Sequence, residues 1–249
     1  ITVPPPYRVD VSSSDELTLK SYDLRSWWFV AVNTNKSALS DTRVRQALNL
    51  ILDRTELRQL SIGVGPEEEN SPCEFISGPF VQSSPYYNRA VEVTERGNIG
   101  EATRLLRAAG LRKVGGTWHH NGEPVRLRIG IKASLDIEAP DLLSQIGNQL
   151  DAAGFGRQEH KISTDEWNRL ALTGQLDDYD LIVGKWSFGL VEDVNPLFHT
   201  REGSRGSLNI FNYSNEQVDG LLDQFVAART QTAAQDAYHS LHQLLAEDL

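Results

Sequence analysis

Apolar positions alternate along this chain between short continuous runs and helically spaced sets, and this alternation predicts an α/β fold. The runs at 27–32 (WWFVAV) and 179–183 (YDLIV) have the density of buried strands, and residues 125–131 alternate as a strand with one buried face does. Residues 155–162 form a further predicted strand. Helices are predicted over about 41–57, 98–109, 138–153, 163–170, 215–229 and 232–248. Strands and helices that alternate with short connections are typical of a sheet flanked by helices.

Polar residues and glycines mark where these elements begin and end. Ser40 or Asp41 is placed to cap the helix over 41–57, and Gly63 and Gly65 are placed to end it. Residues 64–90 are rich in Pro, Gly and Ser, and loops of this length are usually functional or disordered. The loop's aromatic residues favour an ordered loop that packs on a surface; they are Phe75, Phe80, Tyr86 and Tyr87.

Three further signals have a local mechanism. Asn98 stands three residues before Glu101, which resembles a capping box at the start of a helix. The dipeptide 121–122 (Asn-Gly) predicts a tight hairpin turn. Ser163 or Thr164 is placed to cap the helix that follows the strand at 155–162.

The segment that follows the strand at 179–183 is the candidate ligand site. It reads GKWSFGLVEDVNP, and ligands of open α/β sheets lie outside the carboxyl ends of the strands. A tryptophan offers a rigid face for stacking, and glycines allow a ligand to approach the backbone closely. The predicted contacts are Trp186, Ser187, Gly189, Glu192 and Asp193. The alternative is structural, with Trp186 filling the edge of the sheet.

Composition excludes several classes of protein. With 24 Lys and Arg against 34 Asp and Glu, the net charge is −10, and no stretch concentrates the basic residues as nucleic-acid binding by this segment would require. Cys73 is the single cysteine, so no disulfide framework or thiolate zinc site is expected. That count suits the cytoplasm or a bacterial periplasm. No apolar run reaches the length of a membrane span.

The sequence offers no constellation typical of an enzyme. It has no nucleophile elbow, phosphate loop, zinc-protease motif or dinucleotide fingerprint, so no catalytic residue, metal or cofactor is predicted. The pair His119 and His120 is interpreted as exposed hairpin residues because no third ligand is near in sequence. His199 and Glu202 are interpreted as part of a solvated turn, and the glutamates at 67–69 as a solvated charge run.

The two ends of the chain suggest a domain taken from a longer protein. The sequence has no Met, it opens with ITVPPPYRVD, and its helical apolar pattern still runs at Leu249. We therefore expect residues 1–249 to form a single α/β lobe, with residues 1–25 as a linker close to a hinge.

Four segments in order resemble the extracellular solute-binding proteins of ABC importers, family 5, the group of oligopeptide-, dipeptide- and nickel-binding proteins. They are VNTNKSALSDTRVRQALNLILDRTELRQLSIG at 32–63, EATRLLRAAGL at 101–111, YDLIVGKWSFGLVEDVNPLF at 179–198 and FNYSNEQVDGLLDQFVAART at 211–230. The resemblance implies a type II periplasmic-binding-protein lobe with a mixed sheet flanked by helices. In such proteins two lobes joined by a hinge trap a solute, and this chain resembles the distal lobe, without the first.

The resemblance also implies a function. It is that of a non-catalytic receptor, outside the bacterial cytoplasmic membrane, that captures a small molecule or peptide for delivery to a membrane permease. The alternative is a solute-binding-like sensor domain of a cytoplasmic transcriptional regulator. An upstream signal peptide or lipid-attachment cysteine would favour the receptor, and an upstream helix-turn-helix the regulator.

The resemblance assigns roles to individual residues. Trp186 matches a tryptophan that peptide-binding relatives follow, three residues later, with an aspartate for the peptide amine. This chain has Gly189 there, so Glu192 or Asp193 is expected to meet the positive end of the ligand. A second set matches the family framework and is expected to hold the first helix and its neighbouring loop together; it comprises Asn33, Asp41, Arg43, Arg45, Asp53 and Arg54.

Overall fold

A computed structural model describes residues 8–18, 20, 24–62, 73–173, 178–189, 191–202, 205–211 and 213–248. Gly63, Gly65 and the glutamates at 67–69 lie outside these ranges, as do residues 1–7, 19 and 21–23 near the start of the chain. Within them, residues 73–98 form no helix or strand. None of the helices in the described ranges has the length and apolar character needed to span a membrane.

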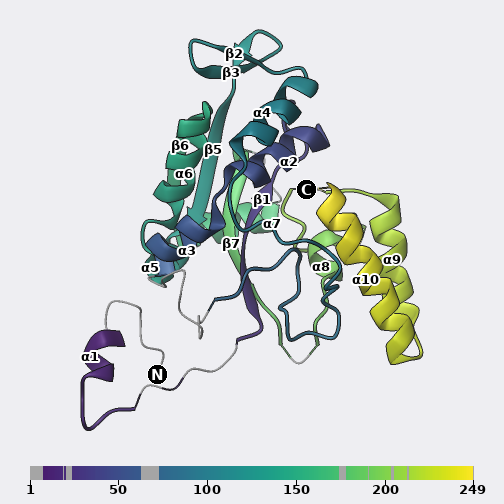
Figure 1. The fold of residues 1–249 in the computed structure, drawn as a ribbon. Coiled ribbons are helices and arrows are strands. Elements are labelled where there is room, and N and C mark those ends of the chain that lie inside the picture. The colour runs from purple at the N-terminus through teal and green to yellow at the C-terminus, as the bar shows by residue number, and fades with distance from the viewer. Residues whose placement is uncertain are drawn as a thin grey trace.

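A four-stranded mixed sheet forms the centre of the molecule (Figure 1). Its order is β1 (Ser26–Val32), β7 (Leu181–Ser187), β5 (Arg126–Lys132) and β6 (Gly156–Ile162). β5 pairs in parallel with both β6 and β7, whereas β1 pairs antiparallel with β7. The carboxyl ends of the three parallel strands and the start of β1 therefore meet at one edge, which we call the carboxyl edge.

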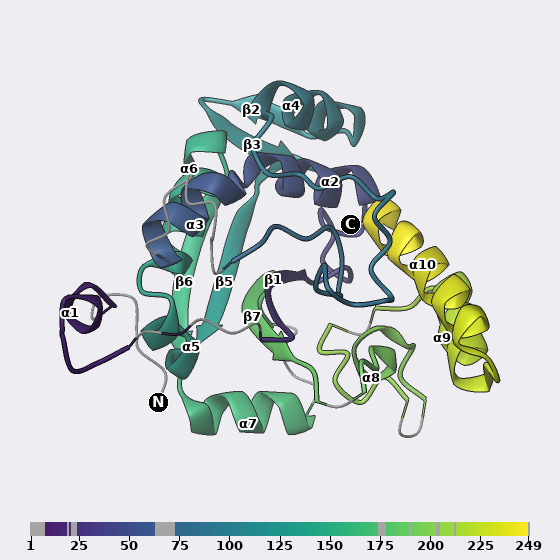
Figure 2. The same ribbon diagram turned by 60° about the horizontal axis from the view of Figure 1, so that its bottom comes forward.

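Helices cover both faces of this sheet (Figure 2). One face packs against α2 (Thr42–Ile51), α3 (Arg54–Ile62) and α6 (Leu142–Ala153), with α4 (Ile99–Ala108) lying on α2. The opposite face packs against α7 (Thr164–Thr173). A small sheet of β2 (Arg112–Val114), β3 (Thr117–His120) and β4 (Glu123–Pro124) projects from the end opposite the carboxyl edge (Figure 1).

A second apolar cluster lies beside β1 and is built from the C-terminal helices. It joins α8 (Asn195–Phe198), α9 (Glu216–Ala227) and α10 (Gln231–Asp248) to the irregular segment 73–98. Phe80 of that segment is fully buried and lies against Tyr238 of α10, with ring centroids 5.0 Å apart. Phe80, Tyr86 and Tyr87 of the predicted loop thus pack on α10, whereas Phe75 lies against Arg58 of α3. A short helix α1 (Arg8–Ser12) stands apart from this body in Figure 1.

One predicted helix is broken in two, and another begins later than predicted. The helix expected over 41–57 ends at Ile51, and α3 begins at Arg54, because Asp53 accepts a hydrogen bond from the Glu56 amide (2.9 Å) and starts a new helix. The helix expected over about 138–153 is α6, which begins only at Leu142, and the short helix α5 (Ala133–Glu138) before it was not predicted. Pro140 lies between them, and a proline disfavours helical backbone in the residue before it.

One strand prediction is confirmed and another needs correction. In β5, Leu127, Ile129 and Ile131 are buried on one face as the alternation predicts, and Gly130 is buried on the other. β7 extends past the predicted apolar run to Ser187, so that Trp186 lies within the strand rather than after it.

The predicted helix caps and the turn are confirmed, but Asn98 and Glu101 do not form a complete capping box, because the Asn98 amide donates to the Leu50 carbonyl and the Glu101 carboxylate pairs with Arg104. Asp41 accepts from the Arg43 amide at 2.9 Å, Asn98 from the Glu101 amide at 3.1 Å, and the Ser163 hydroxyl from the Glu166 amide at 3.2 Å. The Asn-Gly turn has positive φ at both residues, 52° and 90°, as a two-residue hairpin turn requires. It joins β3 to β4.

Candidate functional site: the carboxyl edge

Two tryptophans face each other across the outer strand pair at this edge. Trp27 of β1 is the register partner of Trp186 of β7. Side chains directly opposite in an antiparallel pair lie on the same face, so both indoles lie on the α7 side of the sheet. Phe29 lies 4.8 Å from the Trp27 ring and covers Gly184, where an added Cβ would come within 2.4 Å of the phenyl ring. The glycine therefore makes room for an aromatic layer on this face.

The indole nitrogens of this pair lack hydrogen-bond acceptors. Nε1 of Trp27 and Nε1 of Trp186 are both shielded from solvent, and neither has a hydrogen-bond partner in the described part of the chain. A buried N–H without an acceptor costs about 1–3 kcal/mol. Two such groups on register-paired residues make the tryptophan pair an unusual feature of a sheet face, because buried polar groups are normally satisfied.

Trp186 also connects the sheet to the C-terminal cluster. Its ring lies edge-on to Phe188 at 6.5 Å, and Phe188 stacks on Phe80 at 6.1 Å. Phe80 in turn contacts Tyr238 of α10. The tryptophan is therefore held by a row of aromatic rings that reaches the C-terminal helices.

Glu192 is buried and held inside the protein. Its side chain is 5% exposed, its Oε2 accepts a hydrogen bond from the Ser84 hydroxyl, and its Oε1 lies 3.5 Å from Nη1 of Arg25. The Arg25 side chain is 45% exposed. Glu192 thus links the segment after β7 to the irregular segment 73–98 and to the start of β1.

Asp193 lies just before α8, whose N-cap is Val194. Its Oδ1 accepts from the Asn195 amide at 2.9 Å and lies 3.5 Å from the Tyr238 hydroxyl. Ser187 and Gly189 are exposed, and nothing lies within 4 Å of a Cβ built on Gly189. Of the five residues predicted to bind ligand, Ser187 and Gly189 are thus open to solvent, Trp186 is half-buried, and the two acids have internal partners.

Asn33 fixes the far end of β1. It is fully buried, its Nδ2 donates to the Tyr179 carbonyl at 3.0 Å, and its amide donates to the Asp180 carbonyl at 2.9 Å. Its Oδ1 accepts from the Asn35 amide at 3.1 Å. The side chain therefore ties the end of β1 to the residues that enter β7.

The Asp-x-Arg-Val-Arg motif holds α2 to two other helices. Arg43 pairs with Asp41 and donates to the Ala108 carbonyl at the end of α4 (2.7 Å). The hydrogen bond from the Arg43 side chain to Asp41 keeps the pKa of the Asp41 carboxyl below its ordinary value. Arg45 is buried and donates to Leu39, Ser40, Thr42 and Asp248. Both arginines thus bind main-chain oxygens of neighbouring segments.

Asp53 and Arg54 have equivalent roles at the start of α3. The Asp53 amide donates to Oε1 of Gln149 in α6 at 2.9 Å. Arg54 donates to the Ile76 carbonyl at 2.9 Å and to Oδ1 of Asn49 at 2.6 Å, and burial lowers the pKa of its guanidinium. Gly63 of the same motif lies outside the described residues.

Sequence reasoning missed the β1 side of the edge. Trp27, Arg25 and Ser84 were not predicted, although all three contact or face the predicted residues. The alternation of WWFVAV assigns Trp27 and Trp28 to opposite faces, so a signal for Trp27 was present. No local pattern indicates Ser84, which lies 108 residues from Glu192.

Histidine interpretations were partly wrong. His199 is not in a solvated turn: it is buried, its Nδ1 donates to the Thr200 carbonyl at 2.7 Å, and Asp219 lies 3.6 Å away. His119 and His120 are half-buried, and the Ser37 hydroxyl lies 3.3 Å from Nδ1 of His120. Among the residues with described positions, no group of three His, Cys, Asp or Glu side chains is arranged to hold a metal.

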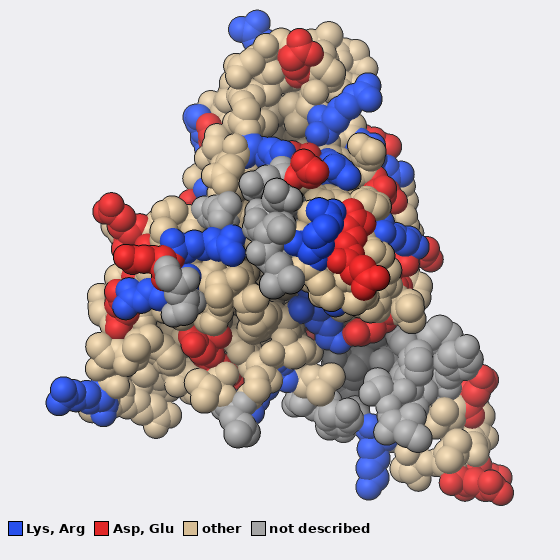
Figure 3. Space-filling model, turned by 180° about the vertical axis from the view of Figure 1, so that it is seen from behind, with Lys and Arg blue, Asp and Glu red and all other residues tan. Residues whose placement is uncertain are grey.

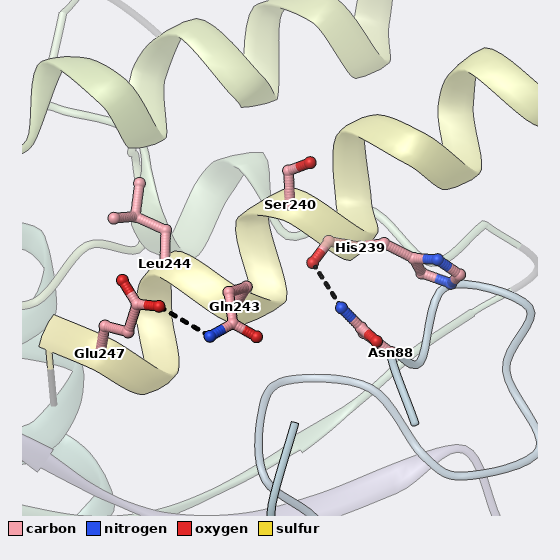
Figure 4. A pocket seen from close by; sticks show the side chains of 6 residues that line it. All are labelled: Asn88, His239, Ser240, Gln243, Leu244 and Glu247. Atoms are coloured by element: carbon pink, nitrogen blue, oxygen red, sulfur yellow. Dashed lines mark hydrogen bonds between the residues drawn. The ribbon is translucent and has the colours of Figure 1, made fainter. Parts of the chain in front are cut away.

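A hollow of about 350 Å³ lies away from this edge, on α10 (Figure 4). It is bordered by Asn88, His239, Ser240, Gln243, Leu244 and Glu247. Two of its polar side chains are already paired, since Asn88 donates to the His239 carbonyl at 3.2 Å and Gln243 to Glu247 at 2.7 Å. We therefore place the candidate site at the carboxyl edge and not in this hollow. On the face shown in Figure 3, basic and acidic side chains are interspersed.

The fold is that of a type II periplasmic binding protein lobe. AppA of Bacillus subtilis, an oligopeptide-binding protein solved with a nonapeptide, superposes with a TM-score of 0.79 at 20% identity over 99% of this chain and 47% of that one. The substrate-binding protein CtaP of Listeria monocytogenes gives 0.80 at 19% identity over 99% and 46%. NikZ of Campylobacter jejuni, solved with Ni(L-His), gives 0.78 at 15% identity over 99% and 48%.

The sequence comparisons place the chain in a family. The profile described as "Bacterial extracellular solute-binding proteins, family 5 Middle" matches residues 1–207, so the chain belongs to family 5 of the bacterial extracellular solute-binding proteins. It is 25% identical over 236 residues to the oligopeptide-binding protein AppA of Bacillus subtilis (strain 168), which covers 90% of this chain and 40% of that protein. The chain thus spans about half the length of these relatives or less.

Proposed function

We propose that this chain is one lobe of a solute-binding receptor of an ABC importer, with the carboxyl edge as one wall of the binding cleft. The observation that carries the proposal is the family match together with a tryptophan pair at the edge where α/β proteins bind ligands. A second lobe of the full-length protein completes the cleft, and closure of the two lobes removes water from the solute. The closed receptor then docks on a membrane permease at the periplasmic or extracellular face.

Within this proposal the five predicted residues divide into two groups. Trp186, Ser187 and Gly189 meet the solute, because Trp186 offers an aromatic face and the other two are exposed. Glu192 and Asp193 do not contact the solute: Glu192 holds Arg25, and Asp193 accepts a hydrogen bond at the start of α8. The receptor is non-catalytic and uses no cofactor of its own.

A peptide is the solute class that we propose. AppA was solved with a nonapeptide, and it is also the curated relative that this sequence matches. A nickel–histidine chelate is the second class, since NikZ was solved with one and has the same fold. The relatives reported above are binding proteins and not regulators, which favours the receptor over the sensor alternative.

The test is a thermal-shift screen of the full-length protein against three solute classes. The probes are di- to pentapeptides, nickel–histidine and oligosaccharides, each followed by calorimetry. A solute that binds the native state at 100 times its Kd stabilises it by about 2.7 kcal/mol, which raises the melting temperature. We expect the rise with peptides. A rise with none of the probes would overturn the receptor proposal, and a rise with the chelate alone would overturn the peptide class.

A further inference from the structure

The acids that follow Trp186 do not present a free negative charge at the carboxyl edge. Glu192 is 5% exposed and is held by Ser84 and Arg25, whereas Asp193 accepts from the Asn195 amide at the start of α8. Gly189, which has no side chain, occupies the position that corresponds to the aspartate of the peptide-binding relatives. Between residues 186 and 194, no exposed carboxylate is therefore available to bind a ligand amine.

The charged group that this edge does present is the guanidinium of Arg25. The Phe188 amide donates to the Arg25 carbonyl at 2.8 Å, so the β1–β7 ladder continues one residue beyond Ser26. Side chains two apart in a strand lie on one face, which places Arg25 on the face of Trp27. Its side chain is 45% exposed and, within the described ranges, makes no hydrogen bond. Its one ion pair, with Glu192, is 3.5 Å long and leaves most of its five N–H donors available.

Glu192 is suited to hold this arginine in position. A buried carboxylate needs a counter-charge, and the Ser84 hydroxyl satisfies its other oxygen. Lys185, another cation of β7, lies on the opposite face, over Trp28 at 5.5 Å and paired with Glu138. Arg25 is therefore the cation on the tryptophan face of the β1–β7 pair, next to two indole N–H groups that also lack acceptors.

We propose that Arg25 binds a carboxylate of the solute, and that Glu192 positions it. This inference rests on the receptor function proposed above and gives it a chemical selectivity: the solute directs an anionic group, and not an amine, toward the β1–β7 side of the cleft. Arginine suits this task because its planar fork matches the two oxygens of a carboxylate. In a peptide, the carboxylate is the C-terminus or an acidic side chain.

The experiment compares matched peptides on the full-length protein by calorimetry. The first pair is pentaalanine with a free C-terminus and its C-terminal amide. The second pair carries Glu or Gln at the central position, with both ends blocked. Pentaalanine with an acetylated amino end serves as the third probe. The variants are Arg25→Met, which keeps the apolar stem, Arg25→Lys, which keeps the charge, and Glu192→Gln. Arg104→Met is the matched control, because Arg104 is a 65% exposed arginine paired with Glu101 on α4.

We expect the wild type to prefer one carboxylate form over its neutral partner by about 10- to 100-fold, as the loss of a charged hydrogen bond implies. The pair that shows the preference identifies the source of the carboxylate. Arg25→Met should abolish the preference, Arg25→Lys should keep part of it, and Arg104→Met should keep all of it. Glu192→Gln should reduce it, because Arg25 loses the group that orients it.

Three results would overturn the assignment of Arg25. Equal affinity for charged and neutral partners would do so, as would a preference that survives Arg25→Met. A large loss on acetylation without any preference for a carboxylate would indicate that the amine is the recognised group. These outcomes differ from the failure of the receptor function itself, in which no probe binds the wild type and both proposals fall.

Discussion

Arg45 of α2 and Asp248 of α10 are joined by two hydrogen bonds, from Nη2 to Oδ1 at 2.7 Å and from Nε to the main-chain oxygen at 2.9 Å. The other donors of the guanidinium bind the Leu39 and Ser40 carbonyls and the Thr42 hydroxyl, so all five N–H groups are used. The second carboxylate oxygen of Asp248 accepts from the Tyr213 hydroxyl at 2.7 Å. One arginine therefore fastens the first helix of the sheet layer to the last turn of the chain's final helix.

Replacing Arg45 with Met should lower the free energy of unfolding by about 3 kcal/mol, because Asp248 would keep a partly buried charge without its partner. Arg45→Lys should rescue little, since an ammonium group cannot reproduce the five-donor geometry. Urea denaturation followed by circular dichroism measures both. Arg43→Met is the control: Arg43 is half-exposed, and its loss should cost less. Equal losses at the two positions would contradict the role assigned to Arg45.

His242 should make the stability depend on pH below neutrality. Burial lowers its pKa to about 4. Its Nδ1 accepts from the Asn88 amide and its Nε2 hydrogen-bonds the Ser77 hydroxyl, both at 3.0 Å. The unfolded chain takes up a proton near pH 6.5 and the folded chain only near pH 4. The contribution of neutral His242 is therefore fully present above pH 6.5 and is lost as the pH falls toward 4, by about 3 kcal/mol in all.

His242→Gln tests this expectation by comparison of slopes. Unfolding free energies of the wild type and the variant are measured from pH 7.5 to pH 4. The variant is expected to be less stable at neutral pH, and the difference between the two proteins should shrink between pH 6.5 and 4. A difference that stays constant over this range would show that His242 does not titrate as its burial requires.

Trp186 should matter to binding more than to stability. Trp186→Ala removes the aromatic face, and we expect the solute identified by the screen to bind about tenfold more weakly or worse. Trp186→Phe keeps a ring but removes the indole N–H, and it should have a smaller effect. Trp28→Phe is the matched control, because Trp28 lies on the opposite face of the neighbouring strand under Lys185. Calorimetry alongside thermal melting separates affinity from folding, and unchanged affinity in Trp186→Ala would remove Trp186 from the site.

Gly184 should tolerate a methyl group far less well than Gly189. A Cβ on Gly184 would lie 2.4 Å from the Phe29 ring, whereas one on Gly189 meets nothing within 4 Å. Gly184→Ala should therefore lower the unfolding free energy by about 1–3 kcal/mol, and Gly189→Ala should leave it almost unchanged. Combining Gly184→Ala with Phe29→Ala should cost less than the sum of the two single changes, since the clash disappears. Strict additivity would argue against the close contact.

Local signals explain why much of the fold was predictable. Asp41, Asn98 and Ser163 cap helices as their residue types suggest, because each cap needs only a side-chain oxygen and the amide two or three residues later. The failures have local causes as well. Helical spacing continues across Leu52 and Asp53, so periodicity alone did not reveal that Asp53 starts a new helix.

The site was harder to predict because its contacts span the chain. The Trp186 segment was found from its position after a buried strand, but the partners of Glu192 were not. Ser84 and Arg25 lie in distant segments that only the folded chain brings to the carboxyl edge. The sequence does not show whether a carboxylate will be exposed or buried. Its role depends on which donors and cations the fold brings next to it.

The pairing of β1 with β7 has a consequence for the order of folding. The two strands lie about 150 residues apart in the sequence, so closing this pair carries one of the largest loop-closure costs in the molecule. Contacts of such separation slow folding, whereas β5 and β6, with α5 and α6 between them in the sequence, pair over about 30 residues. The ribosome also makes β1 well before β7. We therefore expect the tryptophan pair to be among the last elements to form, so that an incompletely folded chain would have a native β5–β6 core without the proposed binding surface.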